Sequence, residues 1–173
     1  RIAEMCQITE EGGGFCIGSI GLMDNVAREL THATGSAVVS VGYRLAPEDP
    51  FPAGLDDCET VVRWALANTD RFGVGPGQVA VAGESAGGNL SAAVALRLRD
   101  AGEDRLAAQV LLYPGLGGST PYASQDEFDG IMLTRKSREV FWSAYSGDQD
   151  IDHDPYAAPL EAESLASLPP ALV

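Results

Sequence analysis

Apolar residues along the chain fall into short continuous runs, separated by segments in which apolar positions recur at helical spacing. The runs predict strands, buried on both faces where they are rich in β-branched residues, at residues 4–9, 36–43, 78–82 and 107–113. The helical spacing covers residues 22–33, 56–68 and 89–100, and Gly35 marks the end of the first helix. This alternation predicts an α/β fold with a central, mostly parallel sheet and helices on both faces.

Two segments interrupt the alternation. Residues 44–52 carry three prolines and are predicted to be irregular. Residues 115–150 are the least regular and most polar, so we expect an insertion above the strand ends, where selectivity usually resides. Within it, Thr134 is placed to cap a helix that runs to about Tyr145. The final residues, 169–173, predict the start of another strand.

Composition restricts the function further. The 173 residues are 45 % hydrophobic, about the size of one globular domain, and no stretch reaches the roughly 20 unbroken apolar residues of a membrane helix. The net charge of −14 disfavours binding to nucleic acid, which requires clustered cations. Three cysteines without C-x-x-C spacing favour unpaired thiols over a zinc site, as in a reducing, cytoplasmic compartment.

A candidate nucleophile stands between the predicted strand 78–82 and the helix that follows it. Gly83, Ser85 and Gly87 form a G-x-S-x-G pattern, in which glycines let strand and helix approach on either side of a strained serine. The backbone N–H of Ala86 then becomes a donor for a negatively charged oxygen. A purely structural glycine-rich turn is the alternative, but the flanking strand and helix favour a nucleophile elbow.

A second glycine run, residues 12–14, follows the first predicted strand. Glycines without side chains let backbone N–H groups turn toward a ligand. Alone, the run is as consistent with a flexible loop; together with the elbow it predicts the other half of an oxyanion hole.

The chain resembles the hormone-sensitive lipase family of esterases, the α/β-hydrolase fold-3 group. The resemblance covers the chain from about residue 11 onward and rests on three ordered motifs: EGGGF at 11–15, GYRLAPEDPFPA at 42–53 and GESAGGN at 83–89. Further similar segments are LLYPG at 111–115, DPYAAPL at 154–160 and LPPALV at 168–173. It implies that residues 1–173 form an incomplete α/β-hydrolase domain, truncated at both ends, in which 115–150 is a cap-like insertion.

The resemblance also implies a reaction. Ser85 would attack a carboxylic ester of small size and form an acyl-enzyme, and the N–H groups of Gly13, Gly14 and Ala86 would stabilise the tetrahedral oxyanion. Glu84 is expected to support the turn, and residues 43–52 to brace the site. No metal or cofactor is expected. Homo-oligomer formation is possible.

The family order Ser…Asp…His places the acid and the base beyond Val173. By order alone, Asp148 and His153 could complete a triad with Ser85, although this segment matches the insertion rather than the family's histidine turn. His32 is expected on a helix surface.

Two departures from the family pattern keep other hypotheses open. Glu11 stands where the family has histidine, and Gly42 where it has aspartate. A carboxylate near the oxyanion hole would oppose the developing charge. A non-catalytic binding protein on the same scaffold, of the kind represented by the plant gibberellin receptors, is therefore the alternative function. A truncated product without a stable fold is a third possibility.

Overall fold

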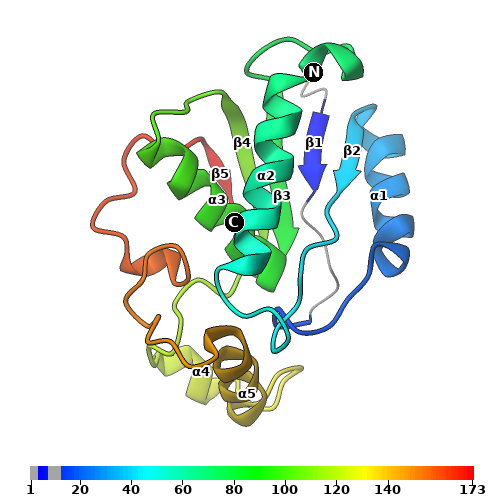
Figure 1. Cartoon of the computed structure of the whole chain (residues 1–173). Coiled ribbons are helices and arrows are strands. Elements are labelled where there is room, and N and C mark those ends of the chain that lie inside the picture. Colours follow the sequence, from blue (N-terminus) through cyan, green and yellow to red (C-terminus); the bar gives the residue numbers. More distant parts are fainter. Residues whose placement is uncertain (1–3, 8–12) are drawn as a thin grey trace.

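The structure is a computed structural model that describes residues 4–7 and 13–173. It contains a five-stranded parallel sheet with the strand order β2-β1-β3-β4-β5 (Figure 1). The strands are β1 (Glu4–Gln7), β2 (Ala37–Ser40), β3 (Val79–Glu84), β4 (Leu106–Leu112) and β5 (Ala171–Leu172). The predicted alternation of strands and helices is therefore confirmed.

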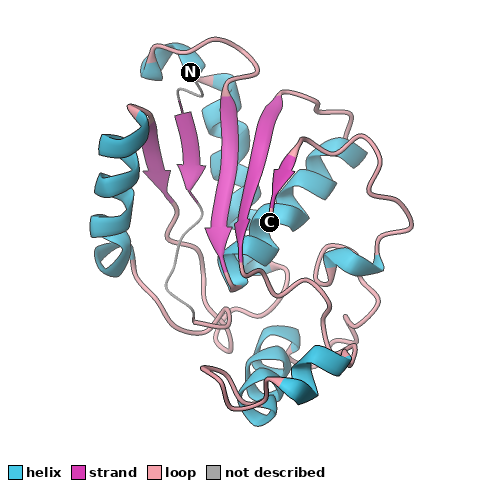
Figure 2. Ribbon diagram, turned by 180° about the vertical axis from the view of Figure 1, so that it is seen from behind, coloured by secondary structure: helices cyan, strands magenta, loops and turns pink. Residues whose placement is uncertain are grey.

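Three long helices flank the sheet: α1 (Ile20–Thr34), α2 (Ala53–Ala67) and α3 (Ala86–Asp100). Strand β2 lies at one edge of the sheet, next to β1. The chain then crosses to the other side of β1, where β3 and β4 follow. Because parallel crossovers are right-handed, this reversal puts α1 on the opposite side from α2 and α3. Viewed from behind, the strands lie in front of α2 and α3, and α1 lies beside β2 (Figure 2).

Two further helices, α4 (Ala123–Glu127) and α5 (Arg135–Ser146), lie beyond the carboxyl ends of the strands (Figure 1). Both belong to segment 115–150. Short 3₁₀ turns at Thr69–Phe72 and Pro159–Glu161 complete the regular structure. The side chain of Thr134 accepts a hydrogen bond from the Ser137 N–H at 3.0 Å, so the predicted cap of α5 is confirmed.

The core lies between the sheet and the pair α2 and α3. Val79 and Val81 of β3 and Leu90 and Val94 of α3 are almost completely buried. The large α3 surface buried here supplies much of the hydrophobic stabilisation and fixes the position of its first turn, next to Ser85.

Several elements differ from the sequence prediction, and three of these differences have a clear reason. Strand β2 is shorter than residues 36–43, because its partner β1 ends at Gln7, the residue paired with Ser40. Helix α2 begins at Ala53 rather than Asp56, and the extra turn carries Leu55 into the core. Helix α4 was not predicted, since a single polar turn is too short to show a periodic pattern.

None of the helices in the described part of the chain is both long and apolar enough to cross a membrane.

Candidate active site

Ser85 occupies the sharp turn between β3 and α3. Its backbone angles are φ 50° and ψ −115°, a region that residues with a side chain rarely adopt. A Cβ added to Gly83 would lie 2.2 Å from the carbonyl oxygen of Gly87. Strand and helix therefore touch at this point, and a residue larger than glycine at position 83 would force them apart.

Hydrogen bonds fix the backbone of Ser85 on both sides. Its N–H donates to the carbonyl oxygen of Leu112 at 2.9 Å, which ties the turn to the end of β4. Its carbonyl oxygen accepts from the N–H groups of Asn89, at 3.1 Å, and Gly115, at 3.4 Å. The strained conformation is thus held by both α3 and the segment that follows β4.

The glycine loop approaches the same place from the other side. Gly13 is buried, and its carbonyl oxygen accepts hydrogen bonds from the N–H groups of Cys16 and Ile17, at 2.7 and 3.0 Å. Gly14 has φ +50°, and a Cβ there would lie 2.2 Å from the ring of Phe141 on α5. Glycine is therefore required at position 14 both by conformation and by space.

One cavity of about 420 Å³ brings the predicted residues together. Gly14, Ser85 and Ala86 all border it, and Gly13 lies one residue before. Most other lining side chains are apolar or aromatic: Phe15, Pro114, Leu116, Tyr122, Leu133, Phe141, Trp142, Leu160 and Val173. The side chain of Ser85 and the glycine loop thus border a pocket of the kind that holds small apolar ligands. Glu10, Glu11 and Gly12 lie outside the described residues.

Segment 43–52 braces the glycine loop against α5. The N–H of Ala46 donates to the carbonyl oxygen of Phe15 at 3.0 Å. The N–H of Phe51 donates to the carbonyl oxygen of Tyr145 at 2.8 Å. The rings of Phe15 and Tyr145 are stacked, with centroids 3.7 Å apart. Hydrogen bonds and ring stacking therefore join the loop, the brace and the helix to one another.

An ion pair secures the start of this brace. The guanidinium of Arg44 pairs with Asp57 of α2 at 2.8 Å, and the N–H of Arg44 donates to the same carboxylate. These hydrogen bonds hold the pKa of the Asp57 carboxyl below its usual value.

Glu84, the residue before the serine, accepts a hydrogen bond from the hydroxyl of Tyr113 at the end of β4. This contact raises the pKa of Tyr113. It agrees with the expectation that Glu84 supports the turn.

Neither histidine borders the cavity among the residues that the structure describes. His153 is exposed and pairs with Glu161 at 3.1 Å, which raises the pKa of its imidazole. His32 lies on the exposed surface of α1. Asp148 is also absent from the cavity lining, so the structure does not assemble a triad from Ser85, Asp148 and His153.

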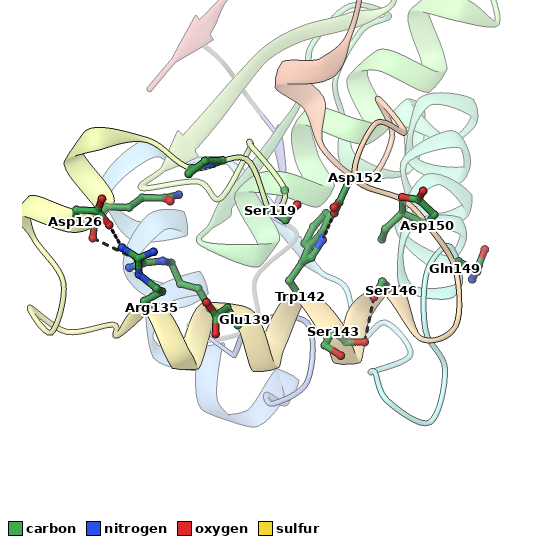
Figure 3. A pocket seen from close by; sticks show the side chains of 15 residues that line it. Ser119, Asp126, Arg135, Glu139, Trp142, Ser143, Ser146, Gln149, Asp150 and Asp152 are labelled. Atoms are coloured by element: carbon green, nitrogen blue, oxygen red, sulfur yellow. Dashed lines mark hydrogen bonds and ion pairs between the residues drawn. The ribbon is translucent and has the colours of Figure 1, made fainter.

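A second cavity, of about 370 Å³, lies beside the first, and most of the residues that line it are polar or charged (Figure 3). Trp142 borders both cavities, and its indole N–H donates to Asp152 at 2.6 Å. Hydrogen bonds from Ser119 and Trp142 lower the pKa of Asp152. Asp126 and Arg135 form an ion pair at the far end (Figure 3).

A match to a known family covers residues 11–173, and the description of that family is an alpha/beta hydrolase fold. The chain belongs to the α/β-hydrolase fold family. The resemblance to its hormone-sensitive lipase group, drawn from three motifs, is thereby confirmed.

Curated and solved members of the α/β-hydrolase family resemble this chain closely. Esterase LipI of Mycobacterium tuberculosis is 39 % identical over 94 % of the chain and 51 % of its own length. Carboxylesterase NlhH of the same species is 42 % identical over 94 % of the chain and 52 % of its own length. The structure of a hyperthermophilic esterase from Pyrobaculum calidifontis matches with a TM-score of 0.93 at 41 % identity, covering all of this chain and 57 % of that one. The chain thus spans about half the length of these α/β-hydrolase relatives.

The wall opposite Ser85 was not predicted from the sequence. Phe141, Trp142 and Tyr122 come from segment 115–150, whose position above the strand ends was expected but whose inward-facing residues were not. The available signal was the adjacent aromatic pair 141–142 on a helix whose first five residues are all polar or charged.

Proposed function

We propose that the whole protein hydrolyses carboxylic esters through an acyl-enzyme on Ser85. The observation that carries the proposal is the cavity shared by Ser85, Ala86 and Gly14, with the serine in a strained strand-to-helix turn. The esterase relatives that match 94 % of the chain support the same reaction class.

The Ser85 hydroxyl oxygen attacks the ester carbonyl carbon and gives its proton to a base. The carbonyl electron pair moves onto oxygen, where the N–H groups of Gly13, Gly14 and Ala86 are assigned to stabilise it. Collapse of this intermediate expels the alcohol, which takes up the proton, and water then releases the acid from Ser85. Loss of one oxyanion donor raises such a barrier by about 3 kcal/mol. We assign the base and its acid partner to sequence that follows Val173 in the whole protein.

The cavity supports a restricted substrate class. Its volume of about 420 Å³ and its apolar walls suit an ester with a short or medium acyl chain. The chemistry as written uses no metal or cofactor, and the net charge of −14 argues against nucleic acid as a partner. A cytoplasmic location and self-association stay predictions from the sequence.

Labelling by a fluorophosphonate probe tests the assignment. The whole protein is expected to react, and Ser85→Ala is expected to abolish the reaction while Ser91→Ala, a buried serine on the same helix, leaves it intact. Turnover of p-nitrophenyl acetate and hexanoate, measured on the same samples, distinguishes an esterase from a binding protein. Undiminished labelling of Ser85→Ala would refute the nucleophile.

A further inference from the structure

Asn89 lies one turn into the helix that begins after Ser85, and it is completely buried. Its side-chain amide donates two hydrogen bonds, to the carbonyl oxygens of Gly115 at 2.7 Å and Ala157 at 2.8 Å. These two acceptors lie at opposite ends of the segment that carries α4 and α5. One amide group therefore joins the nucleophile's helix to both ends of this segment.

The two ends also contact each other. The N–H of Leu160 donates to the carbonyl oxygen of Leu116 at 3.1 Å, next to the two residues that Asn89 holds. The Gly115 N–H in turn donates to the Ser85 carbonyl oxygen. Asn89 is thus the centre of a closed hydrogen-bond network that includes the backbone of the nucleophile.

The strip held by Asn89 forms one wall of the ester cavity. This strip consists of residues 114–118, all of which line the cavity. Two glycines of the strip, Gly117 and Gly118, lie close to aromatic rings. A Cβ on Gly117 would lie 2.5 Å from the ring of Tyr122, and one on Gly118 would lie 3.1 Å from that of Trp142. A displacement of residues 114–118 would therefore change the contacts of both rings.

We propose that Asn89 is a positioning residue that sets the acyl-binding wall of the cavity relative to Ser85. Burying an amide is costly unless its polar atoms are paired. Both N–H groups of Asn89 are paired, whereas its Oδ1 is buried without a hydrogen-bond partner among the described residues, so the two donated bonds are what offsets the cost of burial. Its role in substrate choice depends on the proposed ester hydrolysis at Ser85. Its role in holding the two ends together does not.

The first test compares Asn89→Ala with Ser91→Ala by hydrogen exchange and mass spectrometry on the whole protein. Both residues are fully buried on α3, but the Ser91 hydroxyl has no hydrogen-bond partner, so its removal is the matched control. In Asn89→Ala, peptides covering 113–118 and 156–161 are expected to exchange about 10-fold faster or more, because two hydrogen bonds are lost. Peptides of α1 are expected to stay unchanged. Equal exchange in the two variants would overturn the proposal.

If Asn89→Ala does not fold, hydrogen exchange of the wild-type protein tests the same proposal. Native-state exchange in low urea is expected to show that the amides of Gly115 and Leu160 open in one cooperative step, although they are far apart in the sequence. Independent opening of the two ends would contradict a common anchor.

The second test measures selectivity in the whole protein. A merely structural loss would lower turnover of all esters equally, by lowering the amount of active enzyme. A displaced wall is expected instead to lower the ratio of kcat/KM for p-nitrophenyl hexanoate over acetate by about 10-fold in Asn89→Ala and not in Ser91→Ala. An unchanged ratio would refute the positioning role. Absence of all turnover and of Ser85 labelling in wild type would refute the proposed reaction, while the exchange result still stands.

Discussion

The two sides of the cavity beside Ser85 are built differently. On the side of Ser85, twelve of the fifteen residues of α3 are buried, and β3 is buried almost throughout. On the opposite side, one of the twelve residues of α5 is buried, Tyr145. Ser85 is therefore fixed by the core of the domain, whereas the helix on the facing side buries a single residue. This difference lets the facing wall vary with little effect on the geometry at Ser85.

The largest expected effect comes from the buried side. In Gly83→Ala the new methyl group meets the Gly87 backbone at 2.2 Å, and neither strand nor helix can move away cheaply. We expect a loss of about 3 kcal/mol in the free energy of unfolding together with loss of fluorophosphonate labelling. Urea denaturation and labelling measure both.

Gly21→Ala is the control for this substitution. Gly21 lies in the first turn of α1, where an added Cβ meets nothing closer than 3.9 Å. This change is expected to leave stability equal or slightly higher. If Gly83→Ala also leaves the stability unchanged, the strand and helix at Ser85 are not as tightly packed as described.

A smaller and different effect is expected on the α5 side. Phe141→Ala removes a half-buried ring from the cavity wall and from its contact with Gly14. We expect the ratio of kcat/KM for octanoyl over butyryl esters to change by about 10-fold, with the melting temperature lowered only slightly. The neighbouring Val140→Ala, which is exposed on the same helix, should change neither quantity.

The attachment of α5 can be weakened without touching the cavity. Thr134→Ala removes the side-chain oxygen that accepts from the Ser137 N–H and is expected to cost about 1 kcal/mol of stability. Thr134→Ser retains the oxygen and should cost much less. Denaturant titration of the two variants checks this, and equal losses would show that the cap is not the cause.

The smallest effect is expected from the ion pair at the brace. The folded-state pKa of Asp57 lies below its unfolded value, so the pair stabilises the fold above about pH 4 and this contribution is lost as pH falls through the folded pKa. Asp57→Asn should therefore be less stable than wild type at pH 7, and the difference should disappear in acid. Thermal melts in a series from pH 7 downward measure the difference in stability between the two proteins. A difference that does not shrink at all as the pH falls below about 4 would assign the loss to packing instead.

The same contrast explains what the sequence could predict. The turn at Ser85 is encoded locally: a β-branched strand, glycines at fixed offsets and a long helix identify it without knowledge of the rest of the fold. The esterase family and the parallel sheet follow from these motifs. The wall was not predictable in the same way, because Phe141 reaches the cavity only through the long-range contact of α5 with Gly14. The network around Asn89 was also missed, since its two acceptors are backbone carbonyls with no sequence signature.

The indole of Trp142 forms part of the wall between two cavities, so a change on one side of the ring can alter the shape of the cavity on the other side. Asp152 does not border the ester cavity, yet it holds the N–H of the ring that does. Substitutions in the neighbouring cavity, at Asp152 above all, can therefore reshape the cavity beside Ser85 while leaving Ser85, Ala86 and Gly14 in place.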